Sequence, residues 1–129
     1  MDIRSQILRR SLTVGSVAAF LVGSLASAAV AETSFKEDVY PIIQIRCLSC
    51  HQPGGAGYEA SGLDLRTYES LMKGTKFGPV VVPGNVLESN LNVMVEGRAA
   101  IRMPHNKKPL SKCERMIFRS WVQQGARNN

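Results

Sequence analysis

The residues best suited to chemistry in this sequence form one run, Cys47-Leu48-Ser49-Cys50-His51. Two cysteines three positions apart, followed at once by a histidine, have the spacing at which haem c is attached covalently. Each thiol adds across a vinyl group of the porphyrin to give a thioether, and the histidine offers an imidazole nitrogen to the iron. We therefore interpret Cys47, Cys50 and His51 as the attachment site of one covalent haem c.

The same residues admit three other interpretations. A thioredoxin-like dithiol normally follows a β-strand, whereas an apolar helical pattern leads up to Cys47. A zinc site would draw on Cys47, Cys50, Cys113 and one histidine, but the sequence holds no second pair of closely spaced ligands. A disulfide between Cys47 and Cys50 would close a very tight ring and would give His51 no role. Haem attachment is the interpretation that we favour.

The second axial ligand decides whether a haem iron exchanges electrons or reacts with small molecules. Our candidate is Met103, which stands directly before Pro104 in an expected loop. The proline ring restricts Met103 to extended backbone and lets its thioether project toward the haem. The loop also lies far enough beyond His51 for the chain to cross the porphyrin and return on its other face. Iron held by imidazole and thioether would have no vacant position, which favours electron transfer.

Other side chains compete for this role. Met72 and Met94 fall within expected helices, where methionine usually fills core space. Met116 falls opposite the apolar stripe of the last helix, so we expect it to face solvent. His105 remains an alternative ligand, and Met103 could also be an ordinary loop side chain.

A helix is expected directly before the haem motif. Ser34 and Glu37 have the spacing of a capping box, and an apolar stripe then leads to Cys47. Pro41 lies inside this pattern, so we expect a bend and not a straight helix.

Two more helices are expected downstream, one over residues 67–74 and one that follows Gly84, includes Leu87 and ends at Gly97. The valines at 80–82 stand between prolines, which favours an extended loop over a strand. Loops as long as those in this chain usually carry a site or wrap a ligand in a small domain. They are rich in Gly and Pro and cover residues 52–62, 74–85 and 97–110.

The last helix has the clearest pattern. Ser111 and Glu114 form a second capping box, and Gly125 stands where the helix should stop. Apolar pairs at i, i+4 mark one face: Ile117 with Trp121, and Phe118 with Val122. We expect Trp121 to pack against the first helix. Cys113 falls on the flank of this stripe, which favours a partly buried free thiol over a disulfide to a partner chain.

The composition limits the class of protein. The chain has 129 residues, 44% hydrophobic and 20% charged, which fits one globular domain and excludes collagen-like, coiled-coil and strongly disordered classes. Aromatic residues make up 6% of the chain, so few large side chains can fill a core and a bulky apolar cofactor would compensate. We therefore expect the chain without haem to be largely unfolded.

Residues 32–129 hold 13 basic and 9 acidic residues, a net charge of +4, which mildly favours acidic partners. No basic run with interleaved aromatic residues occurs, so nucleic-acid binding is not expected. Lys107, Lys108 and Lys112 are candidates for docking on an acidic redox partner, although a solvated face is the commoner role of such residues.

Residues 1–31 have the pattern of a secretory signal peptide. Arginines precede an uncharged apolar stretch that ends in Ala29-Val30-Ala31. We expect cleavage before Glu32, a mature domain of residues 32–129 and a periplasmic location. A retained membrane anchor is the alternative, which the Ser, Thr and Gly residues of the stretch disfavour. Export agrees with the motif, because haem c is attached outside the cytoplasmic membrane.

Residues 35–126 resemble the single-haem class I c-type cytochromes, and above all the bacterial cytochrome c domains of planctomycete type. The resemblance rests on the haem motif with its preceding apolar segment and on Gly62-Leu63-Asp64-Leu65-Arg66-Thr67, Val82-Pro83-Gly84 with Ser89 and Leu91, Arg102-Met103-Pro104, and Leu110-Ser111 leading to Trp121-Val122 and Gly125-Ala126.

This resemblance implies an all-α, cytochrome c-like fold, with about four short helices and long loops around one covalent haem. It implies thioether bonds at Cys47 and Cys50 and axial ligation of the iron by His51 and Met103. Two stretches depart from the family pattern: His105-Asn106-Lys107-Lys108, where small and Pro-rich residues are usual, and Cys113.

We expect a periplasmic electron carrier and not an enzyme. It would take one electron from a protein donor and pass it to a protein acceptor through the exposed haem edge, with no small-molecule substrate. The second interpretation is a dedicated electron-accepting subunit of a periplasmic dehydrogenase, for example a molybdenum sulfite dehydrogenase. An enzyme or gas sensor with an open iron would require that Met103 not bind the iron.

Overall fold

The computed structural model describes residues 31–129, so residues 1–30, which make up nearly all of the expected signal peptide, lie outside the described residues. A short π-helix, η1 (Phe35–Val39), is followed by five α-helices: α1 (Tyr40–Arg46), α2 (Ala56–Ser61), α3 (Tyr68–Lys73), α4 (Asn90–Val95) and α5 (Lys112–Gln123). Between residues 31 and 129 there is no strand, and an isolated bridge joins Thr75 to Gly78. The expected all-α class is confirmed.

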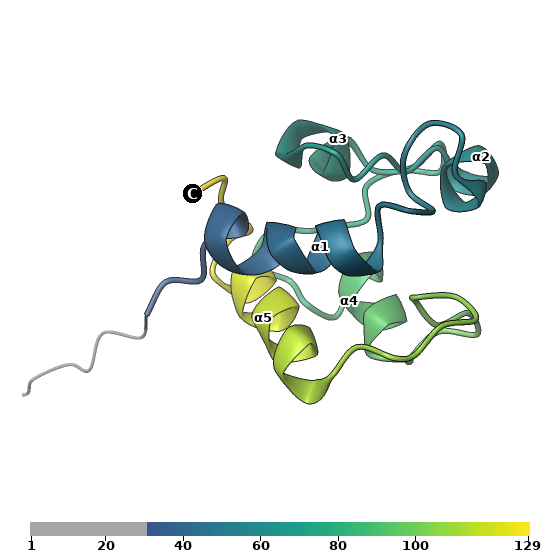
Figure 1. The fold of residues 1–129 in the computed structure, drawn as a ribbon. Helices are drawn as coiled ribbons and strands as arrows, with labels where there is room; N and C mark the ends of the chain where they lie inside the picture. Colours follow the sequence, from purple (N-terminus) through teal and green to yellow (C-terminus); the bar gives the residue numbers. More distant parts are fainter. Residues whose placement is uncertain (1–30) are drawn as a thin grey trace, which may run out of the picture.

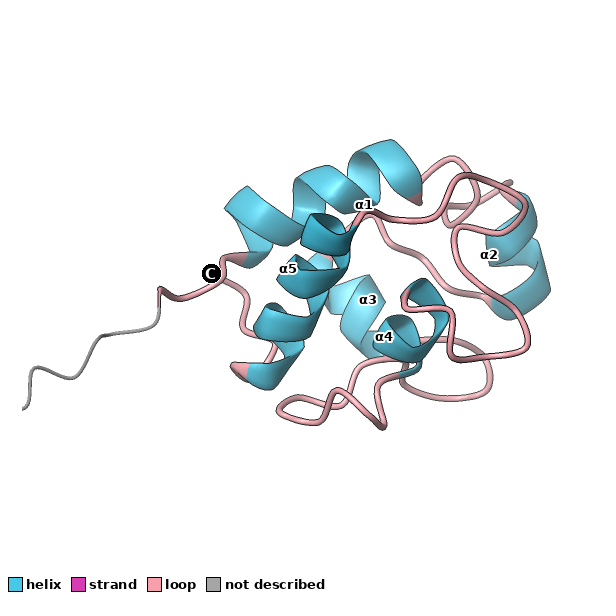
Figure 2. Ribbon diagram, turned by 90° about the horizontal axis from the view of Figure 1, so that it is seen from below, coloured by secondary structure: helices cyan, strands magenta, loops and turns pink. Residues whose placement is uncertain are grey.

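In one view of the domain (Figure 1), α1 lies between two pairs of helices. In the view of Figure 1, α2 and α3 lie above α1, whereas α4 and α5 lie below it. Figure 2 shows that loops make up much of the shell between the helices. Among the described helices, none is long and apolar enough to cross a membrane.

Ser34 caps the first helical segment, but the side chain that accepts a hydrogen bond from the Ser34 N–H is not the one predicted. The Ser34 hydroxyl accepts a hydrogen bond from the Glu37 N–H (3.1 Å), as expected, whereas Asp38 Oδ2 and not Glu37 accepts from the Ser34 N–H (2.8 Å). The π-helical turn of η1 is wider than an α-turn, so Asp38, one residue beyond Glu37, lies close to the Ser34 N–H. Pro41 has no N–H, so the bonding ladder is interrupted there and continues as α-helix.

Trp121 packs against the first helical segment, as predicted, within an aromatic cluster that joins the two ends of the described chain. The Trp121 ring centroid lies 5.5 Å from that of Phe35 and 6.4 Å from that of Tyr68. The indole Nε1 donates a hydrogen bond to the Arg127 carbonyl (2.9 Å). Large buried rings dominate the energetics of a small core, so this cluster holds η1 against α5.

Both helices predicted downstream of the haem motif are present, one of them shorter than expected. Thr67 caps α3 and Gly74 follows its last residue, as predicted. The helix expected after Gly84 starts only at Asn90, and Leu87 lies before it with 70% of its surface exposed. Ser89 explains the late start, because its buried hydroxyl accepts from the Val82 N–H (2.9 Å) and so stabilises a turn.

Helix α2 was not predicted, because residues 52–62 were expected to be loop. None of its six residues is buried, so no apolar periodicity marks it in the sequence. It begins after Gly55 and ends at Gly62, which has φ of 75°.

The exposure of two sulfur-containing residues of α5 tests the predicted faces of that helix. Met116 is 54% exposed, as predicted. Cys113 is a free thiol, but it is exposed and not partly buried, so that prediction was wrong. The first turn of α5 is not buried. The buried residues of this helix all lie in its second half: Phe118, Trp121 and Val122.

Asn92 is a polar residue in the core without a polar partner. Its side chain is fully buried, and neither Oδ1 nor Nδ2 makes a hydrogen bond. A buried polar group without a partner costs about 1–3 kcal/mol of folding free energy. This residue therefore weakens the contact of α4 with the rest of the core.

We predict that Asn92→Leu, an apolar replacement of similar size, raises the free energy of unfolding by about 1–3 kcal/mol. Denaturant unfolding followed by circular dichroism measures this change. Ser89→Ala is the matched control, since it removes a buried polar group that is hydrogen-bonded and should lower stability. A less stable Asn92→Leu protein would show that the amide has a partner in solution.

Candidate haem-binding site

A turn at the end of α1 brings the two cysteines and the histidine together. Cys47 caps the helix, with its N–H bonded to the Ile43 carbonyl (2.9 Å). The N–H groups of Cys50 and His51 both donate to the Cys47 carbonyl, at 3.1 and 3.0 Å. Cys47 and Cys50 are free and half-buried. The predicted attachment residues therefore lie on one hydrogen-bonded turn.

Two glycines let the chain fold back onto this turn. A Cβ atom at Gly57, in α2, would lie 2.7–2.9 Å from three atoms of the His51 ring. A Cβ atom at Gly55 would lie 2.5 Å from the Cys50 carbonyl oxygen. Glycine alone allows such close approach. Sequence analysis missed both contacts, although the glycines of residues 54–57 were the available signal.

The surroundings of His51 keep its ring uncharged. Desolvation by burial lowers the pKa of the imidazole below its usual 6.5, and the nearby Leu63 backbone acts in the opposite sense. The Nδ1 atom is buried and has no partner within hydrogen-bonding geometry. The imidazole is therefore neutral at pH 7, which is the form that binds a metal ion.

The Cys47 thiol is also held in its neutral form. Desolvation by burial raises its pKa from 9.0 to about 11, although the positive charge of Arg46 opposes this effect. A protonated thiol is a poor nucleophile, so this cysteine is unreactive in the folded chain. A thioether suits the position, because it carries no ionisable group to bury.

Met103 lies on the loop between α4 and α5. Its N–H donates to the Met94 carbonyl near the end of α4 (3.1 Å), and its half-buried side chain packs against the hydrophobic core. Further along this loop, Lys107 Nζ donates to Ser49 Oγ within the haem motif (3.0 Å). The structure thus brings the Met103 loop into direct contact with the turn that carries the cysteines.

The other candidate ligands differ in exposure. His105 and Met116 are exposed, whereas Met72 packs against the core from α3 and Met94 is half-buried in α4. Ligation of iron by Met103 stays a prediction, as does ligation by His51.

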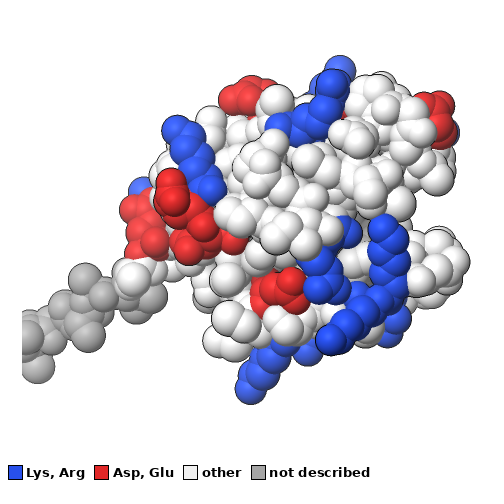
Figure 3. Space-filling model, in the orientation of Figure 1, with Lys and Arg blue, Asp and Glu red and all other residues white. Residues whose placement is uncertain are grey.

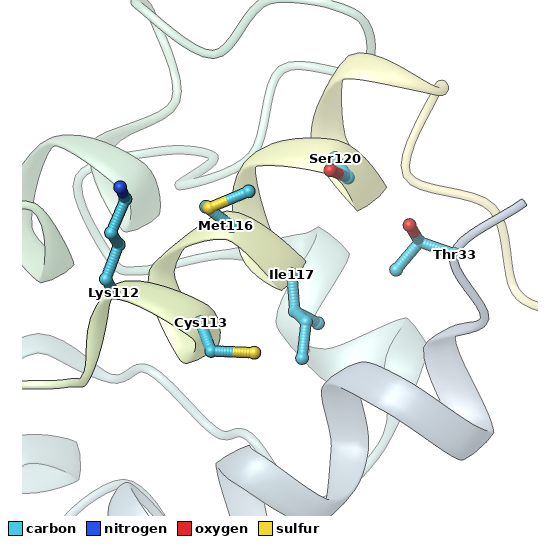
Figure 4. A pocket seen from close by; sticks show the side chains of 6 residues that line it. All are labelled: Thr33, Lys112, Cys113, Met116, Ile117 and Ser120. Atoms are coloured by element: carbon cyan, nitrogen blue, oxygen red, sulfur yellow. The ribbon is translucent and has the colours of Figure 1, made fainter. Parts of the chain in front are cut away.

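Among the described residues, neither a metal-ligand cluster nor a depression on the surface of α5 offers an alternative binding site that uses the haem motif. Within residues 31–129, no three His, Cys, Asp or Glu side chains gather closely enough to hold a metal ion, so the zinc alternative has no such group there. A shallow depression of ≈ 470 Å³ on α5 includes no residue of the haem motif, and Figure 4 shows the side chains that line it. Its lining residues are Thr33, Lys112, Cys113, Met116, Ile117 and Ser120.

Residues 47–106 match the model of a protein family described as Planctomycete cytochrome C. Over these residues the chain is similar to a planctomycete cytochrome c domain. No curated protein and no solved structure matches the chain. A cytochrome c domain implies covalent haem c and a role in haem-based electron transfer, and Cys47 and Cys50 lie inside the matched segment. The resemblance inferred from the motifs is thereby confirmed.

The residues of this cytochrome c domain fit a covalent haem. Two free thiols, a neutral imidazole and a thioether form a suitable set of donors. Leu48, Leu91 and Met103 pack on the core but stay partly exposed, so the apolar faces of a porphyrin would bury more of them. Other apolar residues on either side of the haem motif in the sequence are already buried within the polypeptide: Val39, Ile42, Ile43, Leu63, Leu65 and Trp121.

We predict that Gly57→Ala lowers the stability of the cytochrome c domain by about 1–3 kcal/mol, because the added methyl group would overlap the His51 ring. Helix propensity alone would give the opposite sign, a gain of about 0.5–1 kcal/mol. Denaturant unfolding measures the change, and Glu59→Ala at an exposed position of α2 is the control. A more stable Gly57→Ala protein would mean that the ring does not lie against this backbone.

Proposed function

We propose that this protein is a periplasmic electron carrier that holds one haem c through Cys47 and Cys50, with His51 and Met103 as axial ligands. The contact between the haem motif and the Met103 loop carries the proposal, because it places a soft sulfur donor on a segment bonded to the attachment turn. When bound, haem c supplies an iron that alternates between the ferrous and ferric states.

The proposed ligands suit electron transfer for chemical reasons. Burial keeps the His51 imidazole neutral and ready to donate its lone pair. The thioether of Met103 is a soft donor, which favours ferrous iron and raises the reduction potential relative to two imidazoles. Both side chains are partly buried, so they restrict the access of water and other ligands. Chemistry on a small-molecule substrate is disfavoured by such a site.

The electron partners that we propose are proteins with an acidic docking surface. Figure 3 shows Lys and Arg side chains gathered on one part of the surface. Arg102, Lys107 and Lys108 are exposed on the Met103 loop, and Lys107 contacts the haem motif through Ser49. Positive charge beside the site of electron exchange would steer an acidic partner toward it.

Export of the chain is part of this proposal. Residues 1–31 have the charge and hydropathy pattern of a cleaved signal peptide, which leaves residues 32–129 as the mature domain. Haem c is attached in the compartment to which such a signal leads. N-terminal sequencing of the purified protein would test the cleavage before Glu32, and an uncleaved start at Met1 would support the membrane-anchor alternative.

We predict that production in a host with a haem c maturation system yields a coloured protein whose mass has increased by one haem. Cys47→Ala and Cys50→Ala should each remove one thioether, and the double variant should lose its haem under denaturing conditions. Cys113→Ala is the matched control, since it removes a free and exposed thiol of α5, and should retain the haem fully. A colourless wild-type protein would contradict the proposal.

We predict that Met103→Ala abolishes the sulfur-to-iron charge-transfer band of the oxidised protein and lets carbon monoxide bind the reduced protein. The reason is that loss of the thioether would open one coordination position. Met116→Ala, at an exposed position of α5, is the matched control and should leave both spectra unchanged. Ready binding of carbon monoxide to the wild type would favour a gas sensor or an enzyme.

Purification from the native host separates the carrier from the alternative of a dedicated dehydrogenase subunit. A carrier should elute without a stoichiometric second chain. Stable co-purification with a larger redox enzyme would support the subunit interpretation.

A further inference from the structure

Arg46 is the last residue of α1 and directly precedes Cys47. Its guanidinium Nη2 donates to the carbonyl oxygens of Lys108 (2.7 Å) and Pro109 (3.2 Å), at the end of the Met103 loop. Its Nη1 lies 3.4 Å from Glu114 Oε1, in the first turn of α5. One side chain thus connects the haem-attachment segment to the Met103 loop and to the helix that follows it.

The Met103 loop, residues 96–111, is held at more than one point. Near its middle, the Met103 N–H is bonded to the Met94 carbonyl. Near its far end, the loop is held by the hydrogen bond from Arg46 to the Lys108 carbonyl. Lys107 of the loop also donates to Ser49 of the attachment turn. The loop residues between these anchors belong to no helix, so their position depends on the anchors.

The contacts made by Arg46 are stronger than those of an ordinary surface residue. Its side chain is 23% exposed, and so is that of Glu114. The carboxylate of Glu114 is itself fixed, because its Oε2 accepts from the Ser111 N–H within the capping box of α5. A planar guanidinium can serve two carbonyls and a carboxylate at once, whereas a lysine ammonium cannot reproduce that fork.

We propose that Arg46 is a positioning residue for Met103: it holds the Met103 loop against the haem-attachment turn and thereby stabilises the bond from the thioether to the iron. This inference rests on the proposed ligation by Met103. It assigns the function to a residue outside the haem motif and outside the segment that matches the family. The hydrogen bond from Lys107 to Ser49, on the exposed side, also holds the Met103 loop against the haem-attachment turn.

The test measures how readily imidazole displaces Met103 from the oxidised, haem-loaded protein. Arg46→Ala should bind imidazole about tenfold more tightly than the wild type, the size expected from the loss of hydrogen bonds by a charged donor. Its sulfur-to-iron charge-transfer band should also disappear at a lower temperature. Arg46→Lys keeps the charge but loses the fork, so its imidazole affinity should lie between those of the wild type and Arg46→Ala.

Arg127→Ala is the matched control, because Arg127 pairs with Glu32 (2.9 Å) and has no contact with the Met103 loop. It removes the same charge and one ion pair, and its imidazole affinity should equal that of the wild type. Equal affinities in Arg46→Ala and the wild type, or an equal rise in Arg127→Ala, would overturn the inference. If Arg46→Ala fails to fold, Arg46→Lys and Ser49→Ala decide the matter in the same assay.

The spectrum of the wild type separates this inference from the proposed function. A wild-type protein with attached haem but no sulfur-to-iron band would refute ligation by Met103 and the role of Arg46 together. A wild type with the band, and Arg46 variants that bind imidazole no more tightly, would refute the positioning role alone.

Discussion

The turn that ends α1 is the constraint on which the rest of the structure depends. It holds two thiols and an imidazole within five residues, and the Cys47 carbonyl accepts both hydrogen bonds that close it. Every neighbouring segment must approach this turn closely without blocking it. Gly55 and Gly57 achieve this on one side by having no side chain. On the other side, Arg46 donates to the Met103 loop, and Lys107 of that loop donates to Ser49 of the turn, each through a long polar side chain.

The core and the site lie in different parts of this small domain. The largest buried rings join η1 to α5, and they hold the two ends of the described chain together through Phe35 and Trp121. The site is built mainly from loops, whose positions depend on hydrogen bonds and close backbone contacts. A porphyrin would add apolar surface where the polypeptide supplies least of it. Cofactor binding and completion of the core are therefore expected to be one event.

Features of the fold that arise within a few residues could be read from the sequence. The capping box of Ser111 and Glu114 and the residues that flank α3 are local patterns, and the structure has them where they were predicted. The outcome differed where tertiary contacts intervened. Ser89 is drawn into a turn with Val82 and delays the start of α4, and α2 is stabilised against His51 with no apolar stripe of its own.

The sequence by itself predicted the helical class and the similarity to the family, and it supplies the interpretation of the attachment motif, because each depends on residue types at short, fixed spacings. The tertiary structure decided which distant residues meet the motif. The approach of Gly57 to His51 and the reach of Arg46 to the Lys108 carbonyl join residues with no periodic relation in the chain. Such contacts depend on how loops close in three dimensions, and local spacing carries no record of that closure.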